Sequence, residues 1–516
     1  MHVNREGRNG GAAGDGTSSA TFESRTHQRQ FLIGAQPVLY RSDWRVVRLS
    51  DTAVLSHCPD LPVQTAVDAS GATWVLIGTA IHTTRRSVTP VEEIREHHSS
   101  EIPQLYADWA GRWILIGEGQ VHLDATAMLS CYYARNRSGC SRDLPWVSSS
   151  PALLAEVLGS AAGTEDPREL VYAGKYLTWF PLPGSRFSNI GHLLPSQVLC
   201  LDTGALRARP LLPDLETTRS YEEMLERLES AFVIFFHNLM KQFPTTPRWL
   251  SLTGGGDSRV ILAAARKGGA SLGTFTFAQS HNSIGDDLMP ERVARAAGCK
   301  HIWLRPGVFI PEKAELYDRH TARSIASTSR PRFAQGQMDF GRTGDIIMRG
   351  LCFEICLPDY FDWMPPEELS PPDLAAAWGV KDEYSIALLT EWNDWVKKTP
   401  IEGMDWRTRF YIEQRMAGWF SAIELSVDIT KYLHLNPGNA ARTIALMLAL
   451  PWPKRQGRRQ YQSDLIRSMC PELERLPINP EWDQFSLLSK LQWRWRKDHW
   501  FPVRKLIQRV RRGRKA

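Results

Sequence analysis

The chain has 516 residues, of which 43% are hydrophobic and 23% charged, and its formal net charge is +6. This length is too great for one ordinary hydrophobic core and predicts two domains. The composition is that of a folded protein, and the small net charge does not by itself point to a polyanionic partner. The eight cysteines show neither a CxxC pair nor a Cys/His spacing that suits zinc, so we expect reduced, mostly buried thiols.

Residues 1–31 are polar and rich in Gly, Ser and Arg. They lack the apolar core of a secretory signal, and we interpret them as a disordered leader. The longest apolar stretch, residues 443–450, is far shorter than the roughly 20 residues that cross a bilayer. We therefore expect a soluble, cytoplasmic protein.

Residues 32–212 are expected to form a β-rich domain. Short segments that cluster or alternate β-branched and aromatic residues, such as 44–50, 73–81 and 112–125, are separated by turn residues. Around residues 203–219 the periodicity is lost and two prolines appear, which indicates a domain junction.

Residues 218–484 show a different pattern, in which strands alternate with helices. A long amphipathic helix is expected over 220–243, and shorter helices and strands alternate between 249 and 304. This alternation predicts a parallel sheet covered by helices, with ligands at the carboxyl ends of its strands. The segment 371–470 is expected to be mainly helical.

Residues 485–516 form a basic tail. From residue 490 onward the chain carries eleven Lys or Arg against one Asp, a net charge of +10. Aromatic residues lie among these cations, a pattern that suits an anionic partner or a membrane surface. A solvated terminus is the alternative, and no recognised nucleic-acid motif accompanies the tail.

The turn TGGGDS at 253–258 joins the first strand of the parallel sheet to a helix. Gly254, Gly255 and Gly256 have no Cβ to obstruct a ligand that approaches their N–H groups, and the dipole of the following helix attracts anions. Asp257 would repel a phosphate unless a divalent cation lay between them. Because Mg²⁺ prefers oxygen ligands and substrate phosphates, we expect Mg²⁺ at this turn.

This turn resembles the Ser-Gly-Gly-x-Asp-Ser pyrophosphate-binding loop of the asparagine synthetase superfamily, with Thr253 in place of the first serine. The resemblance implies a PP-loop ATP pyrophosphatase domain with ATP and Mg²⁺ as cofactors. It implies that residues 253–258, ending at Ser258, hold the pyrophosphate and that Asp257 binds the metal. A tight turn without a ligand is the alternative.

Two more segments resemble nucleotide-binding elements of the family. The resemblance implies that the backbone of Thr276 and Phe277 lies against adenine, and Asp286 is matched to an aspartate of the following helix. At 345–356 only Gly350 and Glu354 remain of the family's Gly-x-Gly-x-Asp-Glu loop. Glu354 is expected to act on Mg²⁺ or on an incoming amine, and a buried structural glutamate is the alternative.

The acceptor and lysine elements of the family are altered. Arg415, Ser421 and Glu424 keep their relative positions, but the Pro-Phe-Leu-Asp sequence that follows in the family is lost, which implies an acceptor other than aspartate. The family's lysine, which stabilises the departing pyrophosphate, falls on a glutamine. Arg459 is the expected replacement and Lys431 a fallback.

The first half resembles a class II glutamine amidotransferase domain, an Ntn-type β-sandwich, through residues 109–133 and 146–159. The chain begins MHVNREG and lacks the N-terminal nucleophilic cysteine of that domain, so we expect an inactive glutaminase-like domain. β-Lactam synthetases and lasso-peptide cyclases share this loss and use an amine already present on the substrate.

The combined resemblance implies an α/β protein in which an inactive glutaminase-like sandwich precedes a PP-loop domain with a helical C-terminal part. The implied activity is an ATP-dependent, AMP-forming carbon–nitrogen ligase or cyclase that joins a small-molecule or peptide carboxylate to an amine, for example in lasso-peptide or natural-product biosynthesis. A biosynthetic partner protein is compatible with this role. The alternatives are a noncatalytic nucleotide-binding homologue or assembly partner, and a tRNA-modifying ATP pyrophosphatase.

Overall fold

The computed structural model describes residues 26–135, 144–168, 170, 179–213, 219–279, 282–307, 310–325, 330–338, 341–356, 365, 367–380, 382–455 and 459–500. Residues 26–31 were assigned to the disordered leader, but the structure buries them. The reason is a set of contacts with distant parts of the chain. The guanidinium of Arg29, for example, donates to the carbonyl of Thr430 at 2.7 Å. The remainder of that leader, residues 1–25, lies outside the described residues.

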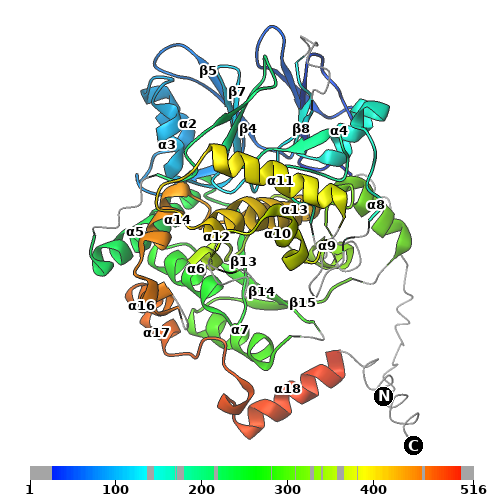
Figure 1. The fold of residues 1–516 in the computed structure, drawn as a ribbon. Helices are drawn as coiled ribbons and strands as arrows, with labels where there is room; N and C mark the ends of the chain where they lie inside the picture. Colours follow the sequence, from blue (N-terminus) through cyan, green and yellow to red (C-terminus); the bar gives the residue numbers. More distant parts are fainter. Residues whose placement is uncertain are drawn as a thin grey trace, which may run out of the picture.

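Two six-stranded antiparallel sheets form the N-terminal part of the molecule (Figure 1). The first has the strand order β10-β8-β9-β1-β3-β2 and the second β12-β11-β7-β6-β5-β4. The strands are β1 (Phe31–Gly34), β2 (Arg45–Arg48), β3 (Val54–His57), β4 (Val63–Val67), β5 (Thr73–His82), β6 (Trp109–Gly117), β7 (Gln120–Leu123), β8 (Tyr132–Ala134), β9 (Val147–Ser148), β10 (Ile190–His192), β11 (Gln197–Cys200) and β12 (Leu206–Ala208). The helical segments are α2 (Pro90–Glu96), α3 (Ile102–Leu105), η1 (Tyr106–Asp108), α4 (Pro151–Leu158) and η2 (Gly159–Ala162).

A shared apolar core joins the two antiparallel sheets into a sandwich. Ile33 and Leu55 of the first sheet belong to the same buried cluster as Ile77 and Ile114 of the second. Two packed antiparallel sheets require apolar residues on the faces that meet, and these residues supply them. The prediction of a β-rich first half is therefore confirmed.

A five-stranded, all-parallel sheet of order β15-β14-β13-β16-β17 forms the centre of the C-terminal part. Its strands are β13 (Arg248–Ser251), β14 (Gly273–Phe277), β15 (His301–Leu304), β16 (Ile346–Met348) and β17 (Leu433–Leu435). This confirms the α/β expectation for the second half. The short strand β17 lies within residues 371–470, which were expected to be mainly helical.

Helices cover this sheet and continue to the end of the described chain. They are α5 (Tyr221–Gln242), α6 (Gly256–Lys267), α7 (Ile284–Ala296), α8 (Pro311–Thr321), α9 (Arg330–Met338), η3 (Phe353–Cys356), α10 (Pro371–Trp378), α11 (Glu383–Lys398), α12 (Trp406–Phe410), the π-helix η5 (Tyr411–Phe420), α13 (Ser421–Val427), α14 (Ala441–Ala449), α15 (Trp452–Arg455), α16 (Gln460–Met469), α17 (Pro471–Glu474), η6 (Trp482–Gln484) and α18 (Leu487–Trp500). Ser220 caps α5, where its hydroxyl accepts from the N–H of Glu223 at 3.1 Å. No helix in the described ranges combines the length and apolar composition needed to cross a bilayer.

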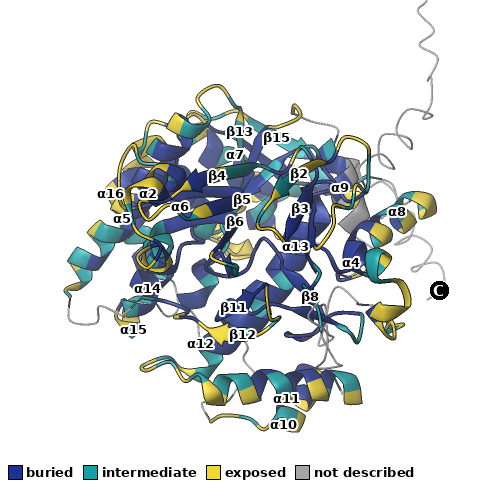
Figure 2. Ribbon diagram, turned by 90° about the horizontal axis from the view of Figure 1, so that it is seen from above, coloured by how far each residue is buried: buried dark blue, intermediate teal, exposed yellow. Residues whose placement is uncertain are grey.

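The two parts of the molecule share one interior. Ile81, Ala110 and Met128 of the sandwich belong to the same buried cluster as the helices around the parallel sheet. Figure 2 shows strands β5 and β6 of the sandwich in dark blue, with exposed residues on outer helices such as α11. The sandwich is therefore packed firmly against the parallel-sheet part.

Candidate functional site

The loop between β13 and α6 lies at the carboxyl edge of the parallel sheet. Two hydroxyl groups fix its shape: Ser258 Oγ accepts from the N–H of Thr253 at 3.2 Å, and Thr253 Oγ1 accepts from the N–H of Gly255 at 3.2 Å. Gly255 is the N-cap of α6 and is extended. The N–H groups of Gly256 and Asp257, in the first turn of α6, have no intrahelical acceptor and suit an anion.

Asp286 lies in the first turn of α7 and contacts the loop directly. Its Oδ1 accepts from the N–H of Gly254 at 3.2 Å, while its Oδ2 accepts from the hydroxyl of Ser283 at 2.9 Å. Ser283 also caps α7 by accepting from the N–H of Asp286. The structure thus brings Asp286 to the loop, where its hydrogen bond to Gly254 positions the loop backbone.

Two glycines allow other elements to approach the loop closely. A Cβ on Gly350, just after β16, would lie 2.7 Å from the N atom of Ser258. A Cβ on Gly256 would lie 2.2 Å from Oε1 of Gln462. Both distances are too short for a real Cβ, so any larger residue at either position would displace the loop or its neighbour.

Asp257 forms a charged pair at the start of α6. Its Oδ1 accepts from Nη1 of Arg459 at 2.7 Å and from Nε2 of Gln462 at 2.5 Å. Burial alone would lower the pKa of Arg459, but the neighbouring anions, Asp257 first, outweigh burial and raise it. The structure therefore places the positive charge of Arg459 at the loop, the position expected for it from the sequence.

Glu354 in η3 faces the same cluster. Its Oε2 accepts from the hydroxyl of Tyr411 at 2.8 Å. Burial raises the pKa of Glu354, and the negative charge of Asp257 adds to this rise, whereas Tyr411 and Arg415 oppose it. A carboxylate with a raised pKa is a better proton acceptor than an exposed one, so Glu354 suits acid–base chemistry as well as metal binding.

The lysine proposed as a fallback lies elsewhere. Lys431 precedes β17, and its carbonyl accepts from the N–H of Gly344, which precedes β16. These residues mark the amino edge of the parallel sheet, opposite the edge that holds the loop. The structure brings Arg459 to the loop and does not bring Lys431 there.

The end of β14 lies beside the loop. The Thr276 hydroxyl donates to the carbonyl of Leu252, just before the loop. The carbonyl of Phe277 accepts from Nδ2 of Asn282 at 2.9 Å. Thr276 and Phe277 therefore share an edge with Asp257, although the Phe277 carbonyl already has a partner.

Three contributors to this site received no role in the sequence analysis. Gln462 and Tyr411 contact Asp257 and Glu354 as described above, and Arg259 is completely buried. Arg259 donates to the carbonyls of Leu476 at 2.5 Å and Pro477 at 3.0 Å, and burial lowers its pKa to about 10. Arg259 could have been noticed from the sequence, because it directly follows Asp257 and Ser258 of the loop. No sequence pattern pointed to Gln462 or Tyr411.

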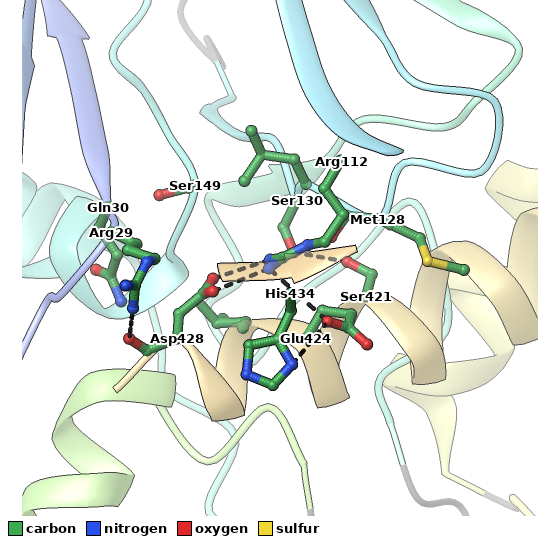
Figure 3. A network of polar contacts seen from close by, with 12 residues as sticks. Arg29, Gln30, Arg112, Met128, Ser130, Ser149, Ser421, Glu424, Asp428 and His434 are labelled. Carbon is green, nitrogen blue, oxygen red and sulfur yellow. Dashed lines mark hydrogen bonds and ion pairs between the residues drawn. The ribbon is translucent and has the colours of Figure 1, made fainter. Parts of the chain in front are cut away.

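A buried polar network connects the sandwich to the edge of this site (Figure 3). Arg112 of β6 forms a two-pronged ion pair with Asp428, with both N–O distances at 2.9 Å. Arg112 Nη1 also lies 3.7 Å from Oε2 of Glu424, whose Oε1 lies 3.3 Å from Nη1 of Arg349. Arg349 precedes Gly350, so the network reaches the residue that packs on the loop.

The acceptor residues expected from the sequence lie in this interface. The hydroxyls of Ser421 and Ser130 of the sandwich are 2.6 Å apart. Glu424 is fully buried between Arg112 and Arg349. Within the described residues, no group of three or more His, Cys, Asp or Glu side chains is arranged to hold a metal ion.

No protein-family model matches the chain, and the comparison with curated proteins gives no match.

Proposed function

We propose that the protein is an ATP-dependent ligase or cyclase that forms an amide bond by adenylating a substrate carboxylate. The observation that carries this proposal is the TGGGDS turn at the carboxyl edge of a parallel sheet, with Arg459 held 2.7 Å from Asp257. On this proposal the parallel-sheet part is a PP-loop ATP pyrophosphatase domain. The sandwich is then a class II glutamine amidotransferase-like domain without its nucleophile.

The loop has the chemistry to bind a pyrophosphate group. The first turn of α6 offers N–H groups and a helix dipole, and Arg459 adds a full positive charge. The carboxylates of Asp257 and Glu354 fit Mg²⁺, since this ion is held by one or two carboxylates together with substrate phosphates and needs no larger protein cluster. When bound, Mg²⁺ would neutralise charge on the phosphates.

The proposed reaction has two steps and needs no reagent other than ATP, the carboxylate and the amine. An oxygen of the substrate carboxylate attacks the α-phosphorus of ATP, the bond to the β-phosphate breaks, and pyrophosphate leaves. The amine then attacks the acyl carbon, the amide forms, and AMP leaves. Arg459 would stabilise the charge on the departing pyrophosphate, although it cannot donate a proton. Glu354, oriented by Tyr411, would accept the proton of the amine.

The sandwich supports an amine supplied by the substrate itself. Within its described part the cysteines are Cys58, Cys131 and Cys200, and all three are buried. Burial raises the pKa of the Cys131 thiol far above its usual range, which disfavours the thiolate. None of these cysteines has the exposure that a glutamine-hydrolysing nucleophile needs.

Product analysis tests this proposal. We expect the protein, incubated with ATP, Mg²⁺ and a panel of peptide and amino-acid carboxylates, to release AMP and pyrophosphate in a carboxylate-dependent way. Asp257→Asn should abolish this release, while Asp51→Asn, which changes an exposed aspartate of the sandwich, should not. Release of ADP and phosphate would contradict the proposal.

A second candidate is a homologue that binds nucleotide without turnover. The observation that favours it is the engagement of Asp257 by both Arg459 and Gln462, because these contacts compete with a metal. This candidate predicts ATP binding by the wild type with no AMP release from any carboxylate. Arg459→Lys separates the two, since a lysine restores proton donation and would raise turnover only in a protein that catalyses the reaction.

A further inference from the structure

The last described helix, α18, has two faces of opposite character. On its inner face Lys497 is 5% exposed, and its Nζ lies 2.8 Å from Oδ2 of Asp287 in α7. Trp493 donates through Nε1 to the same oxygen at 2.9 Å. Asp287 is fully buried, so these contacts attach α18 firmly to α7.

The outer face of α18 is apolar and exposed. Leu487 is 73% exposed, Leu488 78%, Leu491 51% and Trp495 60%. The spacing of these residues places them along one side of the helix. We call them the outer stripe. Elsewhere in the described chain, large exposed hydrophobic residues are scattered, whereas here they are contiguous, which is typical of an interaction surface.

Cations lie beside the outer stripe. Lys490 Nζ lies 5.2 Å and Arg494 Cζ 5.8 Å from the ring centre of Trp482, and within the described residues neither forms an ion pair with a carboxylate. The sequence that follows, 501–516, adds seven Lys or Arg and no Asp or Glu. An apolar stripe flanked by cations matches the surface of an anionic membrane, where apolar side chains enter the acyl boundary and cations bind lipid phosphates.

We propose that the outer stripe of α18 docks the protein on a membrane surface that contains anionic lipids. Figure 1 shows α18 at the end of the molecule opposite the sandwich, where a flat surface can reach it. Other occupants fit less well. Residues 1–25 contain three Arg and three acidic residues with few large apolar side chains, and a second copy would bring like charges together.

Vesicle sedimentation of the full-length protein tests this proposal. We expect binding to vesicles of phosphatidylcholine with phosphatidylglycerol, weaker binding to phosphatidylcholine alone, and a decrease in binding as salt is raised. Leu488→Glu should weaken binding to the anionic vesicles by about tenfold or more, because a charge replaces an apolar side chain in the stripe. Leu39→Glu is the matched control: Leu39 is 53% exposed in the sandwich, and its replacement should leave binding unchanged.

Three results would overturn the proposal. The first is equal binding of wild type and Leu488→Glu, which would assign any attraction to the basic sequence alone. The second is a concentration-dependent dimer that Leu488→Glu abolishes, with no vesicle binding. The third is tight, salt-sensitive binding of an RNA probe that Leu488→Glu leaves intact, again with no vesicle binding. None of these measurements involves ATP, so they are independent of the proposed ligase activity.

Discussion

The sandwich and the parallel-sheet part contain strands of similar apolar character but differ in where their polar groups end up. In the sandwich, neighbouring strands run in opposite directions, and ionisable side chains such as His122 and His192 are buried in its interior. In the parallel sheet every strand ends at the same edge, and that edge gathers Asp257, Glu354 and Arg459. The direction of the strands thus decides which part gathers its charged groups at one edge.

The largest effect is expected at the junction of the two regions. Arg112→Ala would leave the buried carboxylate of Asp428 without its arginine partner and would leave Glu424 with Arg349 alone of its two arginines, which should lower the free energy of unfolding by about 3 to 5 kcal/mol. Urea denaturation measures this change. Arg467→Ala, which removes the two ion pairs that this exposed arginine of α16 forms with Asp464 and Glu474, should have little effect. Equal effects of the two substitutions would show that the regions are not coupled through Arg112.

Acid should weaken both parts of the molecule, because each buries histidines whose pKa is lowered, among them His434 of β17 in the parallel sheet. Burial lowers the pKa of both His122 and His192 from 6.5 to about 3. The unfolded chain therefore binds protons that the folded chain does not, so stability is lost as pH falls below 6.5, by on the order of a few kcal/mol.

Hydrogen exchange at decreasing pH, corrected for the intrinsic rate, measures this loss of stability. Protection of β10, which contains His192, and of β17, which contains His434, should both fall as pH drops below 6.5. The substitution His192→Gln should reduce the acid sensitivity of the sandwich, because an amide does not titrate. Equal loss of protection of β10 in wild type and His192→Gln would contradict this prediction.

Gly350→Ala should damage the parallel-sheet region alone. Its Cβ would lie 2.8 Å from the carbonyl carbon of Asp257, so the loop must shift. We expect a loss of about 1 to 3 kcal/mol in the free energy of unfolding, together with weaker ATP binding. In Gly255→Ala the nearest atom would lie 3.4 Å away, and the fold should keep its stability. Calorimetric unfolding compares the two variants.

The smallest effect concerns the pH dependence of Glu354. The pKa of this carboxyl is raised above 4.5, mainly by burial. Between 4.5 and the raised value the folded chain holds a proton that the unfolded chain has lost, so stability falls as pH rises. Glu354→Gln should therefore become more stable than wild type as pH rises, whereas Glu118→Gln in an exposed turn of the sandwich should not. Melting temperatures recorded across pH measure this slope.

The sequence predicted the features that depend on local pattern. Alternating strands and helices indicated the parallel sheet, and the three glycines before Asp257 indicated the loop. The amphipathic pattern over 220–243 indicated α5, because such a pattern involves neighbouring residues. These features need only a few consecutive residues to be recognised.

The features that the sequence did not predict depend on contacts between distant residues. Arg112 and Asp428 are separated by 316 positions, and no periodicity links them. Gln462 reaches Asp257 only because α16 packs on α6. Lys431 was a candidate for its charge alone, and the parallel direction of β17 places it at the opposite edge from the loop.

Hydrogen exchange in the presence of ATP and Mg²⁺ tests the central claim most directly, because it locates the nucleotide on the chain. We expect the first turn of α6, at Gly256 to Ser258, to become protected on addition of ATP and Mg²⁺, with no change in β5 and β6 of the sandwich. Asp257→Asn should remove this protection. Unchanged exchange at the loop in the wild type, or protection confined to the sandwich, would contradict the assignment of the loop as the ATP site.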